Sequence, residues 1–133
     1  ECVAPLGSVY QAGTLSGNPC AVAAGIAQLK LIESTADLYQ RLDSSAEKLH
    51  AAMLEKGLNA NRCGSLLTVF FTDKPVTDYD TARGCDTEKF AGYWRHMLSG
   101  GIYAAPSQFE AMFVSYAHSD EDIERTVQVI KAL

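Results

Sequence analysis

The sequence predicts an α+β domain, in which helices pack on a small, mainly antiparallel sheet. Four segments carry apolar residues at the three-to-four spacing of a helix face, and shorter segments between them are rich in β-branched and aromatic residues. Their order along the chain is helix, helix, strand pair, helix, strand pair, helix. With 133 residues, the chain has the size of one domain with one core. The second face of such a sheet must be covered by the helices or by something outside the chain.

Four helices are predicted from periodicity and from their end signals. The first begins after Asn18 and the last after Ser119, because both residues cap helix N-termini well. The two central helices span Asp37 to Lys56, ending at Gly57, and Thr87 to Leu98. One face of the first helix carries its apolar positions, which are Val22, Gly25, Ile26, Leu29 and Ile32.

Two pairs of strands are predicted between these helices. The run "SLLTVFFT", Ser65 to Thr72, indicates a largely buried strand, and a weaker one precedes it at Leu58 to Arg62. The runs "IYAA" and "MFVSYA" form the second pair, separated by the loop "PSQFEA". The stretch "DKPVTDYDTARGCD" has the Pro, Gly and Asp content of a surface connection.

Charge and composition exclude several classes of protein. A net charge of −5 offers no basic surface for nucleic acid. No apolar run approaches the roughly 20 residues that span a bilayer, and no signal peptide is recognisable, so we expect a cytoplasmic protein that binds no membrane. The cysteines lack metal-ligand spacing and are expected to be free thiols, with no metal site; they are Cys2, Cys20, Cys63 and Cys85.

The first candidate site is "VYQAGTLSGNP", Val9 to Pro19, just ahead of the first helix. A turn rich in Gly, Thr and Ser at a helix start can direct backbone N–H groups and a hydroxyl at an anion. The lysine of a P-loop is missing, which excludes that mode of nucleotide binding. By composition alone, the stretch is either a plain capping loop or a phosphate site.

The second candidate is Glu110, a carboxylate between two apolar strands. It is either exposed on a loop tip or held in a partly dehydrated position for a purpose, since burying an unpaired charge is costly. Three histidines, His50, His96 and His118, share no ligand spacing with acids or cysteines, and structural or solvated roles are expected for them.

At these residues, the sequence resembles the glutamate-1-semialdehyde 2,1-aminomutase family, pyridoxal-phosphate enzymes related to class III aminotransferases. The resemblance is carried by "GSVYQAGTLSGNP", by "TVFFTDKPVTDYDTARGCDTEKFAGYWRHMLSGG" and by "GIYAAPSQFEAMFVSYAHSDEDIE", and covers essentially the whole chain. It implies the small carboxy-terminal domain of a fold-type-I enzyme, with residues 1–17 ending the large domain and residues 18–133 forming an interdomain helix and the small domain. It also implies a homodimer that makes 5-aminolevulinate from a small-molecule substrate for tetrapyrrole synthesis.

The resemblance assigns roles to individual residues. Gly13 and Thr14 match a pair that contacts the phosphate of the pyridoxal phosphate bound in the other subunit. Glu110 matches an acid near the substrate. Ser107 and Gln108 are expected to shape the same loop. Met112 stands where the family usually has glycine, which affects the fine geometry of the Glu110 loop.

None of the chain's lysines occurs in the sequence context of the family's Schiff-base lysine, so no residue of this chain inherits that role. We therefore expect a carboxy-terminal piece that is inactive alone, binds little cofactor by itself and associates through exposed apolar surface. Two other readings stay open. One is a fragment of another class III aminotransferase, and the other is a stand-alone binding or assembly module without catalysis.

Overall fold

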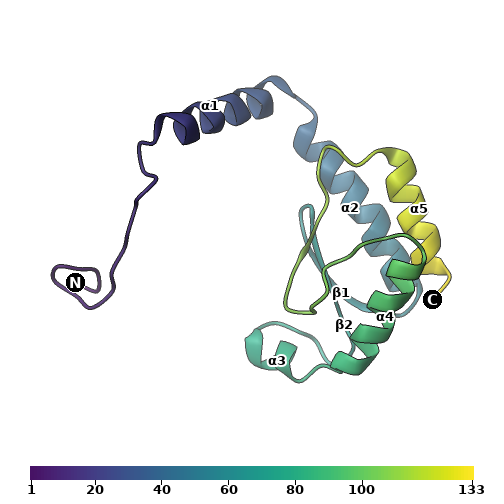
Figure 1. Cartoon of the computed structure of the whole chain (residues 1–133). Helices are drawn as coiled ribbons and strands as arrows, with labels where there is room; N and C mark the ends of the chain where they lie inside the picture. Colours follow the sequence, from purple (N-terminus) through teal and green to yellow (C-terminus); the bar gives the residue numbers. More distant parts are fainter. The chain divides into compact units, whose positions relative to one another are not determined.

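The computed structural model describes residues 1–133, which divide into two compact units, Glu1–Ala36 and Asp37–Leu133. The first unit contains helix α1 (Pro19–Ser34). The second contains, in order, α2 (Leu38–Glu55), β1 (Asn59–Cys63), β2 (Leu66–Phe70), α3 (Tyr79–Arg83), α4 (Thr87–Ser99), β3 (Met112–Phe113) and α5 (Asp120–Lys131). Figure 1 labels these elements along the chain, except the two-residue strand β3. No helix is both long and apolar enough to cross a membrane. Each unit is described below by itself.

The second unit is built on a three-stranded antiparallel sheet with the order β1-β2-β3. Strands β1 and β2 form a hairpin whose register runs from Asn59 opposite Phe70 to Cys63 opposite Leu66. Gly64 lies in the turn with a φ of +55°, a left-handed conformation that favours glycine. Strand β3 is short and pairs with β2 only at Leu66 and Leu67.

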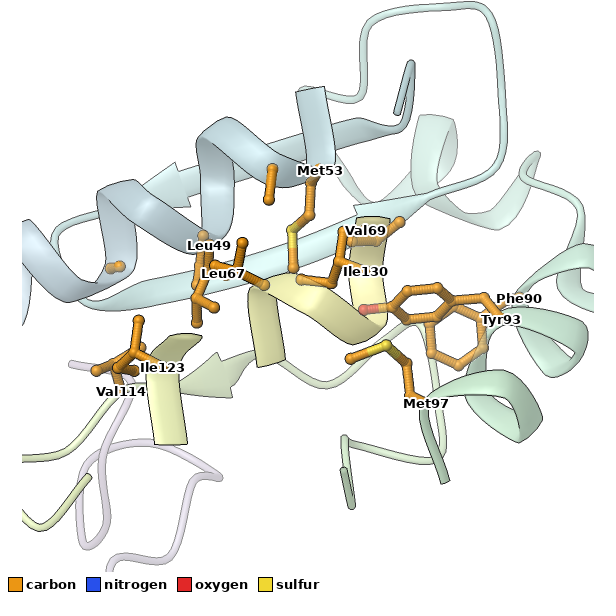
Figure 2. Packing of buried hydrophobic residues seen from close by; sticks show 13 residues of the cluster. Leu49, Met53, Leu67, Val69, Phe90, Tyr93, Met97, Val114, Ile123 and Ile130 are labelled. Carbon is orange, nitrogen blue, oxygen red and sulfur yellow. The ribbon is translucent and has the colours of Figure 1, made fainter. Parts of the chain in front are cut away.

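The main hydrophobic core lies between β2 and the helices α2, α4 and α5. Helices α2 and α5 run side by side, as Figure 1 shows. Their apolar side chains point toward one another and toward the sheet (Figure 2). The most completely buried of these side chains are Met53, Leu67, Met97, Ile130 and Val69. Residues from four elements thus close one core, because each element presents one apolar face.

Part of the second face of the sheet is covered by α3 and the segment that leads into it. A small second cluster joins Phe70 of β2 to Val76, Ala82 and Cys85. The Asn61 side chain of β1 fastens this segment, since its Nδ2 donates a hydrogen bond to the Val76 carbonyl at 2.8 Å. The rest of this face is open, since the paired residues Leu66 and Phe113 are exposed by 37% and 67%.

Most predicted elements are confirmed, with three corrections. The predicted strand "MFVSYA" is a strand only at Met112–Phe113, and it pairs with β2 rather than with "IYAA". The segment "IYAA" is not a strand, because its backbone is bonded elsewhere: Ile102 N donates to the Met97 carbonyl at the end of α4, and the Ala104 carbonyl accepts from Trp94 Nε1. The predicted surface connection at residues 73–86 contains helix α3, which begins with a capping box between Asp78 and Thr81. Its five residues are too few to show helical periodicity.

The first unit carries α1 with the predicted cap. The Asn18 side chain accepts hydrogen bonds from Cys20 N and Ala21 N, both at 3.1 Å, and Pro19 occupies the first helical position. No residue of α1 is buried, and on its apolar face Val22, Ile26 and Leu29 are exposed while Ile32 is half-buried.

Candidate functional site

The loop from Gly13 to Asn18 forms consecutive turns at the start of α1. Ser16 N donates to the Gly13 carbonyl at 2.9 Å, and Asn18 N donates to the Leu15 carbonyl at 3.0 Å. A Cβ atom added to Gly13 would lie 2.6 Å from the Ser16 hydroxyl oxygen. A side chain at Gly13 would therefore require the Ser16 hydroxyl to rotate away, whereas the Ser16 Cβ atom is at an ordinary contact distance of 3.5 Å.

This loop leaves several hydrogen-bond donors free. The Thr14 hydroxyl and the N–H groups of Thr14, Leu15 and Gly17 make no hydrogen bond within the chain, and all three residues are exposed. The first N–H groups of α1, in contrast, are already bonded to the Asn18 side chain. An anion at this loop would consequently be held by the turn and the threonine hydroxyl more than by the helix end.

Glu110 lies in the second unit, on an exposed turn between α4 and β3. Glu110 N donates to the Ser107 carbonyl at 3.1 Å, and Phe109 N donates to the Ser107 hydroxyl oxygen at 3.2 Å. The Glu110 carboxylate makes no ion pair or hydrogen bond within the chain. Of the two readings of Glu110 from the sequence, the structure supports the exposed one, which leaves the carboxylate accessible to a ligand.

The loop before Glu110 is packed against α3. Gln108 is buried beneath this helix, and the ring of Phe109 lies 6.0 Å from the ring of Tyr79. From the sequence, Gln108 had only a general role in shaping the loop. Its burial could not be predicted from neighbouring residues, because its hydrogen-bond partner Ala82 lies 26 residues earlier in the chain.

The histidines have the structural roles expected of them. His50 Nε2 lies 3.0 Å from the Ala60 carbonyl oxygen, and His96 Nε2 lies 2.8 Å from that of Val129. His118 Nδ1 accepts a hydrogen bond from Ser115 N at 3.0 Å, just before α5. All four cysteines are free thiols; Cys85 is buried, and burial raises the pKa of its thiol. No group of three or more His, Cys, Asp or Glu side chains is placed to hold a metal ion.

The structure describes the two candidate groups separately. Gly13 and Thr14 lie in the first unit and Glu110 lies in the second. Each offers one kind of chemistry, anion binding by the Gly13–Asn18 loop and proton or amine binding by the Glu110 carboxylate.

Comparison with solved structures defines the class of the protein. The chain is similar to part of a β-phenylalanine aminotransferase from Variovorax paradoxus, with a TM-score of 0.73 and 25% sequence identity, over 97% of this chain and 31% of that one. The fold is therefore that of a small carboxy-terminal domain of an aminotransferase. No protein-family model matches the chain.

Sequence relatives narrow this class to particular enzymes. The chain is 53% identical to the glutamate-1-semialdehyde 2,1-aminomutase of Syntrophus aciditrophicus and 54% identical to that of Chlorobaculum tepidum, over 96% of this chain and 31% of each relative. It is 49% identical to the Thermus thermophilus protein of the same name, over 98% of this chain and 32% of the relative. The chain is thus homologous to a portion of the glutamate-1-semialdehyde 2,1-aminomutases, and spans about a third of their length.

Proposed function

We propose that the chain is the carboxy-terminal portion of a glutamate-1-semialdehyde 2,1-aminomutase, an isomerase that converts glutamate 1-semialdehyde into 5-aminolevulinate. One observation carries this proposal. Relatives with that name match nearly the whole chain at 49–54% identity, well above the 25% identity to the aminotransferase of similar fold. The complete enzyme would work as a homodimer.

Pyridoxal phosphate is the cofactor that this function requires, and the Gly13–Asn18 loop fits its phosphate group. Gly13 has no side chain to block an approaching phosphate, and the free Thr14 hydroxyl and neighbouring N–H groups are suitable hydrogen-bond donors to it. When bound, the cofactor supplies the electron sink for moving the amino group. The loop would hold the phosphate of the other subunit's cofactor and so fix the cofactor's position.

Glu110 would serve the substrate end of the same site. Its carboxylate is exposed and has no partner within the chain, so it can accept hydrogen bonds from a substrate amine or hold a proton. This role places an unpaired acid where a cationic amine would neutralise it.

A chimaera tests the proposed activity. The corresponding portion of the Thermus thermophilus aminomutase, 32% of that protein, is replaced by this chain, and 5-aminolevulinate is measured with glutamate 1-semialdehyde as the sole substrate. We expect product without any added keto acid, because an intramolecular transfer needs no second substrate. Product that appears only with a keto acid would indicate an aminotransferase instead, and a folded chimaera without either activity would favour a non-catalytic module.

The phosphate role of Thr14 is tested in the same chimaera by Thr14→Val, which keeps the side-chain shape and removes the hydroxyl. Loss of a hydrogen bond to a charged group costs about 1.5–3 kcal/mol, so we expect cofactor affinity to fall by about 10- to 100-fold. Equilibrium dialysis with pyridoxal phosphate measures this affinity. Thr35→Val is the matched control, since the Thr35 hydroxyl donates to the Leu31 carbonyl outside the loop. Equal affinity of the Thr14 and Thr35 variants would argue against the phosphate role.

A further inference from the structure

Gln108 is the one polar or charged residue that is buried, with 2% of its surface exposed. Its Nε2 donates a hydrogen bond to the Ala82 carbonyl of α3 at 3.2 Å. Because a carbonyl can only accept, the nitrogen end of the amide must face Ala82. The side chain therefore ties the loop before Glu110 to a helix formed 26 residues earlier.

The other end of this amide has no partner. Gln108 Oε1 is buried and makes no hydrogen bond. A buried acceptor without a partner costs free energy, which an apolar side chain of similar size at this position would avoid. Such a residue would also lose the hydrogen bond to Ala82, so the N–H donor is the part of Gln108 that the loop uses.

The acceptor of this bond is well fixed to the sheet. Helix α3 begins with the reciprocal hydrogen bonds of Asp78 and Thr81, and Ala82 packs in the small cluster with Phe70 of β2. The segment before the helix is held by the bond from Asn61 to Val76. Gln108 thus bonds to a helix that is itself joined to the sheet.

Glu110 itself is held by its backbone, since its N–H donates to the Ser107 carbonyl and its side chain makes no hydrogen bond. Glu110 lies two residues after Gln108, and its own side chain has no contact partner of opposite charge. Besides Gln108, the contact of the half-exposed Phe109 ring with Tyr79 joins the loop to α3. On its other side, Glu110 is followed two residues later by Met112, which pairs with Leu67 of β2. Gln108 is thus the buried polar tie on the side of the turn that precedes Glu110.

We propose that Gln108 is a positioning residue that fixes the Glu110 carboxylate for its work on the substrate. The inference rests on the proposed function of Glu110. Removing the Gln108 N–H would leave the fold intact and let the Glu110 turn shift, and a shift of about 1 Å in a catalytic group can cost 100-fold in rate.

The test is a double-mutant cycle in the chimaera with Gln108→Met, Glu110→Gln and both together. We expect kcat to fall by about 10- to 100-fold in each single variant, with little change in KM. The double variant should be no slower than Glu110→Gln alone, because Gln108 acts through Glu110. Gln128→Met is the matched control, since the Gln128 amide is exposed and bonds only to Glu124; it should leave kcat unchanged.

The possible outcomes separate the inference from the proposed function. Multiplicative losses in the double variant, or an unaffected Gln108→Met beside an impaired Glu110→Gln, would overturn the inference and leave the role of Glu110 standing. An unaffected Glu110→Gln would overturn the role of Glu110, and the inference with it.

Two further measurements cover a variant that does not fold or a chimaera that is inactive. Gln108→Glu should regain activity relative to the parent as the pH falls, because a protonated carboxyl group can again donate a hydrogen bond to Ala82. A ratio of variant to parent activity that does not change with pH would contradict a positioning role of the Gln108–Ala82 bond. In the 133-residue chain, Gln108→Met should accelerate hydrogen exchange of the Glu110 amide, which is bonded to Ser107. An unchanged exchange rate of the Glu110 amide would overturn the positioning role of the Gln108–Ala82 bond independently of any activity.

Discussion

Among single residues, Tyr93 and Gln108 are the two that carry a buried polar atom without a partner. They differ in what surrounds the unpaired atom. The other end of the Gln108 amide donates a hydrogen bond to the Ala82 carbonyl. Tyr93, in contrast, lies in the main core among apolar side chains (Figure 2), with 4% of its surface exposed. Burial raises the pKa of Tyr93 to about 12, because the charged phenolate would lose its hydration. The stability that buried Tyr93 contributes is therefore lost at alkaline pH.

We predict that alkaline pH destabilises the chain through Tyr93. Between the ordinary pKa of 10.0 and about 12, the unfolded state releases a proton that the folded state keeps, so stability falls as the pH rises. The slope for this one group approaches about 1.4 kcal/mol per pH unit. Urea unfolding of Tyr93→Phe should lack this slope, whereas Tyr103→Phe, at an exposed tyrosine, should keep it. The same slope in both variants would contradict the prediction.

At the scale of elements, local signals explain which helices could be predicted. The box between Ser119 and Asp122 at the start of α5 is formed as the spacing indicates. Hydrogen bonds from Ser119 are the main cause of a lowered pKa at Asp122, and the equivalent bonds from Thr81 lower the pKa of Asp78. Both carboxylates therefore support the fold above their unfolded pKa, and this support is lost as the pH falls through the lowered values.

We predict that Ser119→Ala destabilises the second unit by about 1 kcal/mol, since it removes the cap that accepts from Asp122 N. The midpoint of urea unfolding measures the loss. Ser99→Ala, at an exposed serine in the last turn of α4, is the control and should change stability by less than half as much. Equal losses would show that the box contributes nothing specific to α5.

The elements that sequence alone predicted incorrectly are those decided by partners distant in the chain. Ile102 to Ala105 have strand-like composition, but the end of α4 and the Trp94 side chain take their backbone groups. The burial of Gln108 likewise depends on Ala82, which no local pattern indicates. The roles of Gly13, Thr14 and Glu110 came from a family resemblance, because their spacing alone left both a structural and a functional reading.

At the scale of the whole molecule, the two units differ in how they bury apolar surface. The second unit has a core drawn from four elements, whereas α1 in the first unit buries no residue. Val22, Ile26 and Leu29 of α1 are exposed by 46%, 49% and 65%. Covering such an exposed apolar face with another surface is favourable, because it removes apolar area from water.

We predict that the isolated chain associates with a second copy of itself through α1. Sedimentation velocity over a range of concentrations should show reversible dimers or larger species, whose fraction rises with protein concentration by mass action. Replacing Ile26 and Leu29 together by serine should shift the distribution toward the monomer. The matched control replaces Lys30 and Glu33, exposed polar positions of the same helix, and should leave association unchanged. A monomer at every concentration, or an equal effect of both pairs, would show that the face of α1 does not drive association.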